Sequence, residues 1–188
     1  MNKLSFIISD FSEGGTKKTI TKLIKQLNKD NFKITIITFE KKKTVFKNNR
    51  IKYINLNLYE SSKNKITALI NNIYRIIKLR QVIKNNQNSC LVSFLPSTNI
   101  ISIISNLFLK NKIIVNERND AKRQPINLIW KILRIIFYRF ASKIICNSEN
   151  SKKYLSKFIE EKKIIFIPNH IELKKNFLIK RKKIVLSV

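Results

Sequence analysis

The chain has 188 residues, of which 44% are hydrophobic, and this is enough to bury one sizeable core. Lys and Arg number 39 against 11 Asp and Glu, so the formal net charge is +28 and attraction to polyanions is expected. Nucleic acid, anionic lipid and phosphorylated substrates all fit this charge, and a general compositional bias toward Lys, Asn and Ile is the alternative without function. Cys90 and Cys146 lie in separate apolar runs without metal-ligand spacing, which favours reduced thiols in a cytoplasmic protein and argues against a metal site.

The first apolar run, residues 4–9, is too short for a signal peptide, has no small-residue cleavage site and is typical of a strand. Gly14 and Gly15, the two glycines of the chain, follow it and precede a helical pattern. Their spacing excludes a Walker loop, and the third glycine of a dinucleotide-binding fingerprint is absent. A glycine pair at such a turn permits positive φ and lets a ligand approach the backbone, unless it serves the turn geometry alone.

Apolar runs alternate with helical patterns along the rest of the chain. Helical spacing of apolar residues covers 20–27 and 66–77, and the further apolar runs occupy 34–39, 51–56, 90–94, 112–116, 144–147, 164–167 and 184–188. Near-continuous apolarity is typical of strands covered on both faces. The pattern predicts an α/β fold, a Rossmann-like, doubly wound and mostly parallel sheet with helices on both sides.

Ligands of such sheets bind beyond the carboxyl ends of the strands, and polar residues follow several of the predicted strands. The acidic ones at these positions, five of the eleven in the chain, are Asp10, Glu13, Glu117, Asp120 and Glu149. The others are Pro96, Ser97, Thr98, Asn99, Arg118, Asn119, Ser148, Pro168, Asn169 and His170. The alternative is that Ser97, Thr98 and Ser148 are helix N-caps, with acidic side chains favoured in first helical turns.

Residues 126–140 form the most apolar segment, interrupted by Lys131, Arg134 and Arg139 and too short to span a bilayer. Two interpretations remain open. A helix is predicted over 126–141, and it is either a buried helix covering the sheet or a helix lying at a membrane surface, with the three cations on anionic head groups.

The chain ends in a charged, weakly periodic stretch followed by a further strand pattern. Residues 1–169 are therefore expected to form one domain, and residues 170–188 a linker with the first strand of a missing second domain. His170, the only histidine, is expected to be an ordinary loop residue, and no Ser/His/Asp order can be assembled around it.

The ordered motifs resemble the N-terminal domain of family 4 glycosyltransferases. The motifs are Glu13-Gly14-Gly15, "SFLPSTN" (93–99), "NERND" (116–120), "ICNSENSKKYL" (145–155) and "IPNHI" (167–171). The last strand pattern, "KKIVLSV" (182–188), is similar to the one that opens the family's C-terminal domain. The resemblance implies the N-terminal half of a GT-B architecture and retaining, metal-independent transfer of a sugar from a nucleotide donor, with no other cofactor.

The resemblance also implies site residues. It places Gly14 and Gly15 against the donor diphosphate, and Glu117 and Arg118 at the acceptor and reaction centre as catalytic residues. It assigns further substrate-binding positions to Ser97, Thr98, Ser148 and Asn169. His170 departs from the family pattern, which usually has a small residue or proline there.

The expected function is transfer of a sugar to a lipid-linked or surface-polysaccharide acceptor by a cytoplasmic protein. A peripheral position on the inner face of the cytoplasmic membrane is also expected. Most donor contacts would belong to the absent C-terminal domain, so the 188-residue chain is expected to be inactive alone. The alternatives are a basic nucleic-acid-binding domain and a non-catalytic remnant. No RNA- or DNA-binding motif supports the former, and no nucleic-acid partner is expected.

Overall fold

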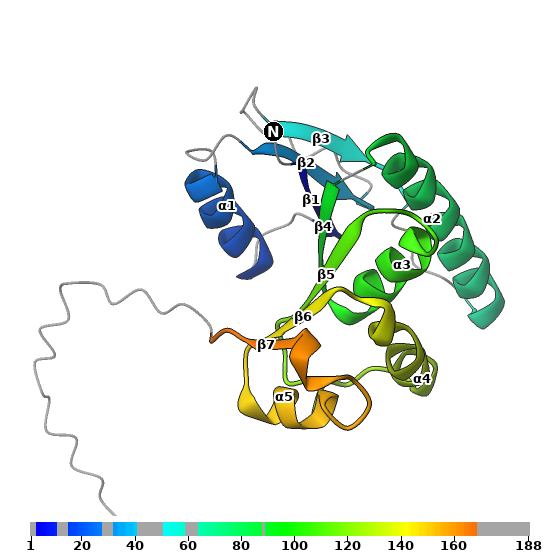
Figure 1. Ribbon diagram of the computed structural model, residues 1–188. Helices are drawn as coiled ribbons and strands as arrows, with labels where there is room; N and C mark the ends of the chain where they lie inside the picture. Colours follow the sequence, from blue (N-terminus) through cyan, green and yellow to red (C-terminus); the bar gives the residue numbers. More distant parts are fainter. Residues whose placement is uncertain are drawn as a thin grey trace, which may run out of the picture.

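The computed structural model describes residues 3–10, 15–27, 32–40, 51–58, 64–87 and 89–168. Its centre is a sheet of seven parallel strands in the order β3-β2-β1-β4-β5-β6-β7 (Figure 1). The strands are β1 (Lys3–Ile8), β2 (Lys33–Thr38), β3 (Ile51–Asn55), β4 (Ser89–Phe94), β5 (Lys112–Glu117), β6 (Lys143–Cys146) and β7 (Ile164–Phe166). Each begins within a residue of a predicted apolar run, so the α/β, Rossmann-like fold is confirmed.

Within the described ranges, five α-helices connect the strands, together with short 3-10 segments. They are α1 (Gly15–Leu27), α2 (Lys65–Asn85), α3 (Pro96–Asn106), α4 (Leu128–Phe137) and α5 (Glu149–Leu155), with η2 (Tyr138–Phe140) and η3 (Glu161–Lys163). The helix predicted over 126–141 is shorter than expected, because α4 ends at Phe137. Asn127 is its N-cap and accepts a hydrogen bond from the Trp130 amide at 3.0 Å, so Ile126 stays outside the helix.

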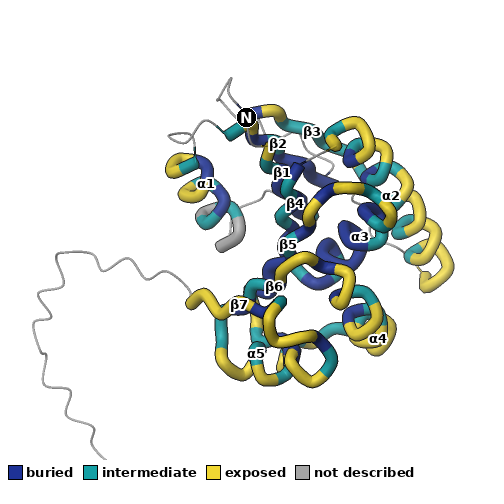
Figure 2. Tube along the Cα trace, in the orientation of Figure 1, coloured by how far each residue is buried: buried dark blue, intermediate teal, exposed yellow. Residues whose placement is uncertain are grey.

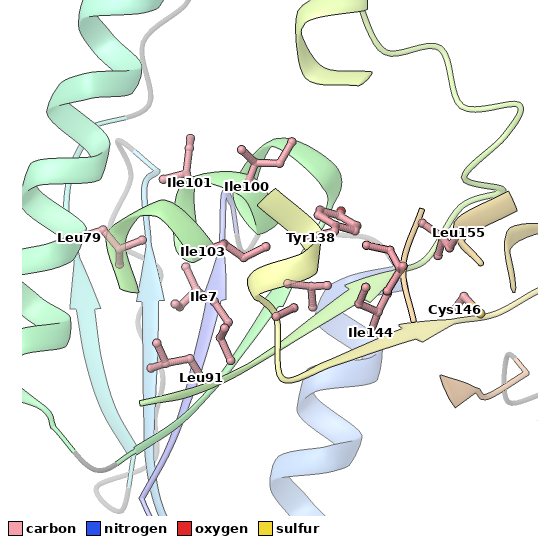
Figure 3. Packing of buried hydrophobic residues seen from close by; sticks show 14 of the residues in the cluster. Ile7, Leu79, Leu91, Ile100, Ile101, Ile103, Tyr138, Ile144, Cys146 and Leu155 are labelled. Carbon is pink, nitrogen blue, oxygen red and sulfur yellow. The ribbon is translucent and has the colours of Figure 1, made fainter. Parts of the chain in front are cut away.

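The two faces of the sheet carry separate cores. Alternate strand residues point to opposite faces, so Phe6 and Ile36 pack with Ile20 of α1. Ile7 and Leu91 pack instead against the helices of the other face, α2, α3 and α5, with Tyr138 (Figure 3). The helices therefore cover both faces, as predicted for a doubly wound sheet.

Coverage is unequal along the sheet. In Figure 1, α1 lies beside the β1–β2 end, whereas α2, α3 and α4 line the opposite face. Ile165 of β7 is 38% exposed, in contrast to Ile7 and Ile36 of the inner strands, which have no exposed surface. The expectation that the strands are covered on both faces is therefore wrong for β7.

Candidate functional site

The carboxyl ends of the strands bring most of the predicted site residues to one edge. Parallel pairing of β1 with β4, β4 with β5 and β5 with β6 aligns these ends. The residues there that the structure describes are Gly15, Ser97, Thr98, Glu117, Arg118 and Ser148. Gly14, Asn169, His170 and the strand predicted at 182–188 lie outside the described residues. Gly15 is the first residue of α1 and its φ is not positive.

The turn from β4 into α3 is built by a strained residue and a proline. Leu95 is the N-cap of α3 and has a left-handed φ of 76°, and Pro96 occupies the first helical turn, where its missing N–H costs nothing. No side chain caps this helix, so the interpretation of Ser97 and Thr98 as N-caps is wrong. Ser97 is half-buried and Thr98 is 2% exposed, so of the two only Ser97 presents appreciable surface at the edge.

Glu117, at the end of β5, is fully buried. The Tyr138 hydroxyl donates a hydrogen bond to its Oε1, and Arg134 Nε lies 3.6 Å from the same oxygen. Burial raises the pKa of Glu117, while the Arg134 charge and the Tyr138 hydrogen bond act in the opposite direction. Its Oε2 has no hydrogen-bond partner among the described residues. The carboxyl group is thus held inside the domain, and the half-buried Arg118 is the neighbour that reaches the surface.

Buried polar groups connect Glu117 to the end of β4. Asn99 donates to the Tyr138 hydroxyl at 3.1 Å and to the Asn116 carbonyl at 3.3 Å. Ser93 Oγ donates to the side-chain Oδ1 of Asn99 at 2.8 Å. Burial and the Glu117 charge raise the pKa of Tyr138 well above its usual range, so this hydroxyl remains a donor. The network joins the loops that follow β4 and β5.

Arg134 ties the loop after β5 to α4. Its Nη1 donates to the Ala121 carbonyl at 2.7 Å and its Nη2 to Gln124 Oε1 at 3.1 Å. The side chain is 1% exposed, so the expectation that Arg134 meets lipid head groups is wrong. The Glu117 carboxylate draws it inward, because a buried carboxylate needs a cation.

The loop after β5 is held from the other side by β6 and α5. Ser148 is the N-cap of α5 and accepts a hydrogen bond from the Ser151 amide at 3.1 Å, which confirms the capping interpretation for this serine. Ser151 Oγ in turn accepts the Ala121 amide at 2.9 Å, and Asn147 donates to the Arg118 carbonyl. The edge formed by the ends of β4, β5 and β6 is therefore a single hydrogen-bonded unit.

The comparisons with known proteins identify the family. The model of glycosyltransferase family 4 matches residues 13–175, most of the chain. The chain belongs to glycosyltransferase family 4. The resemblance stated from the motifs is thereby confirmed, and the match spans the carboxyl-edge loops described above.

Known relatives of the family 4 domain are about twice its length. A GalNAc-α-(1→4)-GalNAc-α-(1→3)-diNAcBac-PP-undecaprenol α-1,4-N-acetyl-D-galactosaminyltransferase of Campylobacter jejuni is 28% identical over 174 residues, covering 90% of this chain and 47% of that protein. The lipopolysaccharide outer core galactosyltransferase WaaB superposes with a TM-score of 0.70 at 13% identity, covering 92% of this chain and 47% of WaaB. The chain therefore spans about half the length of these relatives.

The fold alone is shared more widely. Sucrose-phosphate synthase of Thermosynechococcus elongatus superposes with a TM-score of 0.69 at 9% identity, over 89% of this chain and 48% of that one. UDP-GlcNAc 2-epimerase of Methanocaldococcus jannaschii superposes with a TM-score of 0.62 at 19% identity, covering 87% of this chain and 45% of the epimerase. Because an epimerase shares the fold, the family match and not the superposition assigns the chain to family 4.

Three features of the family 4 domain complete the description of its site and surface. Within the residues that the structure describes, no three His, Cys, Asp or Glu side chains gather as metal ligands do. In the same residues, no helix combines the length and the apolarity needed to cross a bilayer. Cys90 is half-buried and Cys146 buried, both are free, and burial raises the pKa of each thiol.

Proposed function

We propose that this family 4 domain is the acceptor-side half of a retaining transferase that moves a hexosyl group from a nucleotide sugar to a lipid-linked or surface-polysaccharide acceptor. The match to the family over residues 13–175 is the observation that carries the proposal. The named activity of the Campylobacter jejuni relative, which acts on a glycan joined through a diphosphate to undecaprenol, supports a lipid-linked acceptor.

The donor site is assigned to a second domain. Because the chain covers only 47% of that relative, we propose that the nucleotide sugar is bound mainly by a C-terminal domain and that these 188 residues alone do not transfer sugar. Gly14, Gly15, Ser97, Ser148 and Asn169 are proposed to line the cleft between the two halves. The reaction is proposed to need no metal ion.

The contacts of Glu117 and Arg118 suggest different roles for these two residues. Glu117 has no exposed surface and is occupied by Tyr138 and Arg134, so we assign it as a positioning residue for the loop after β5. Arg118 is half-buried at the edge, and Asn147 holds its carbonyl. Its guanidinium is proposed to contact the reacting substrates, where it would stabilise the charge of the departing diphosphate.

The surface supports a place at the membrane. On α2, apolar side chains on successive turns are exposed, among them Ile66, Leu69, Ile70 and Ile73 at 48–71%. Exposed apolar residues of α4 are Leu128, Ile129, Ile132, Ile135 and Ile136. Figure 2 shows both helices with exposed outer faces on the same side of the molecule. With a net charge of +28, this surface is suited to anionic lipid, and we propose a peripheral position on the cytoplasmic membrane face.

The proposal is tested by transfer assays on a detergent-solubilised protein that joins this chain to its donor-binding half. Labelled nucleotide sugars are offered with a lipid-diphosphate glycan, and the label in the lipid extract is measured with and without a chelator. Label is expected in the lipid with the joined protein and absent with the 188-residue chain alone. Failure of every nucleotide sugar to label any glycan would overturn the proposal.

The role of Arg118 is tested in the same assay. Arg118→Ala is expected to lower kcat by about a hundredfold or more, the usual effect of removing a group that stabilises developing charge. The control is Lys110→Ala, which removes an exposed cation just before β5, at the opposite edge of the sheet. Equal activity of the two variants would contradict the assignment.

A further inference from the structure

A basic pocket lies between α5 and the loop that follows β5, outside the proposed cleft residues. It encloses about 360 Å³. Four cations line it: Lys122 and Arg123 in the loop, and Lys153 and Lys157 on and just after α5. The remaining lining residues are Asp120, Asn150 and Tyr154. We call this the α5 pocket; none of its seven lining residues is among those proposed to line the cleft or to contact the substrates, so the inference below does not rest on the proposed function. Asp120 is one of the polar residues that the sequence placed beyond the strand ends.

Helix geometry places the α5 side of the pocket on one face. Asn150, Lys153 and Tyr154 lie within α5 at positions i, i+3 and i+4, which is the spacing of neighbours on a helical surface, and Lys157 lies in the turn just after the helix. Tyr154 is also anchored, because its ring packs edge-on against Phe158 with centroids 5.5 Å apart. These four residues therefore line one side of the same volume.

The loop side is held in place by hydrogen bonds within the chain. Asp120 Oδ1 accepts the amides of Lys122 and Arg123 at 2.9 and 3.3 Å, so the pocket's only carboxylate is engaged with backbone donors. Ala121, between them, donates to Ser151 Oγ of α5 at 2.9 Å and accepts from Arg134 at 2.7 Å. The cations are thus carried on a backbone already fixed relative to α5, which reduces the ordering cost of binding.

The charges of the pocket are unbalanced. Four cations face one carboxylate, and none of the four makes an ion pair among the described residues. Other lysines of the same region do find acidic partners, since Lys152 lies 3.2 Å from Glu161 and Lys162 lies 2.8 Å from Glu160. Lys and Arg side chains that converge without a counter-ion repel one another, and a multivalent anion removes that repulsion.

We propose that the α5 pocket binds a diphosphate or a closely similar phosphoryl group. Ammonium and guanidinium donors form their strongest hydrogen bonds with phosphate oxygens, and Arg and Lys together supply both forked and single donors. The volume of about 360 Å³ exceeds the space needed by one small ion, and the Asn150 amide and Tyr154 phenol add neutral donors. The phosphoryl group belongs either to a soluble diphosphate or to a membrane phospholipid.

The test compares two variants of the 188-residue chain with equal net charge. Lys153→Gln/Lys157→Gln removes two cations from the pocket, and Lys25→Gln/Lys84→Gln removes two exposed cations from α1 and α2. Inorganic diphosphate is titrated calorimetrically near physiological salt, which screens diffuse attraction to the basic surface. The parent chain should bind diphosphate saturably. Lys153→Gln/Lys157→Gln, the pocket pair, should raise the Kd about tenfold or more, and Lys25→Gln/Lys84→Gln, the control pair, should raise it by less than about twofold.

A second arm of the test, sedimentation with lipid vesicles, distinguishes the two sources of the phosphoryl group. Phosphatidylcholine vesicles with and without phosphatidate are sedimented with the same three proteins, whose folding is checked by circular dichroism. Loss of phosphatidate-dependent binding in the pocket pair supports a lipid head group, whereas a loss confined to inorganic diphosphate supports a soluble ligand. Equal behaviour of the pocket and control pairs in both arms, or equally tight binding of citrate, would overturn the proposal.

Discussion

At the residue scale, Arg134 departs from the usual distribution of polarity along a surface helix. It is the one buried residue of α4, while Ile129 and Ile132 are exposed. Sequence patterning assigns cations to the solvent side, and that rule predicted the wrong environment for Arg134. The missing information was long-range, because the partner that draws the guanidinium inward is Glu117, seventeen positions earlier and on a strand.

The buried carboxyl group of Glu117 makes stability depend on pH in a specific direction. Because burial raises its folded-state pKa above the ordinary 4.5, the folded chain binds this proton more tightly than the unfolded chain. Its contribution to stability is fully present below about pH 4.5 and is lost as the pH rises through the folded-state pKa. Relative to Glu117→Gln, which does not titrate, the parent should lose about 1.4 kcal/mol for each unit by which the pKa is raised.

The measurement is urea denaturation of both proteins in parallel between about pH 4 and pH 8, with the free energies of unfolding subtracted. Glu160→Gln is the control, for which the difference in unfolding free energy should change with pH in the opposite direction. The hydrogen bond from Lys162 lowers the pKa of this exposed Glu160 carboxyl, so the parent should gain relative to that variant as the pH rises. A parent that gains relative to Glu117→Gln over the same range would contradict the buried-carboxyl account.

At the scale of elements, the strands could be predicted from the sequence, whereas only some of the helix N-termini could be. Runs such as Phe6–Ile8 are apolar throughout because the inner strands are buried on both faces, and such runs are visible without any structure. The N-cap role of Ser148 could also be predicted, since capping is a local property of a Ser that precedes a helix. The start of α3 could not be predicted in this way, because its N-cap is Leu95, which has a left-handed φ and no capping side chain, and Ser97 and Thr98 therefore lie inside the helix.

This difference between the two helices predicts a difference between two serine-to-alanine changes. Ser148→Ala removes the oxygen that accepts the Ser151 amide and should cost about 1 kcal/mol of unfolding free energy. Ser97→Ala, in a helix without a side-chain cap, should stay within about 0.5 kcal/mol of the parent. Urea denaturation of the two variants checks the difference, and an equal cost would show that the cap at α5 does not stabilise the fold.

At the scale of the whole molecule, α2, α3 and α4 share one side of the sheet, and the outer two helices present exposed apolar residues there. The sequence led to two interpretations of the segment that includes α4, a buried helix and a membrane-surface helix. The structure combines them, because Arg134 and Tyr138 are buried toward the sheet while the isoleucines face outward. The helical period of residues 66–77 indicated the equivalent apolar stripe on α2. The predicted doubly wound fold led us to expect that stripe to pack against the sheet.

The membrane proposal predicts that vesicles containing anionic lipid sediment the chain in a salt-sensitive manner and that neutral vesicles do not. Ile129→Gln/Ile132→Gln on α4 should lower the partition coefficient about tenfold or more, because two apolar side chains leave the interface. The matched control is Phe108→Gln/Ile167→Gln, two exposed apolar residues outside α2 and α4. Equal loss in both variants, or equal binding of the parent to neutral vesicles, would contradict a specific membrane face.

The strand order carries a consequence for synthesis on the ribosome. β1 lies between β2 and β4, and its Lys3 is in register with Lys33 on one side and Ser89 on the other. At about 5–20 residues per second, the second neighbour is translated roughly 4–17 s after β1. During that interval Phe6, Ile7 and Ile8, which are almost fully buried in the finished domain, lack β4 as a neighbour. The nascent chain therefore offers a natural binding site for chaperones at its N-terminal end.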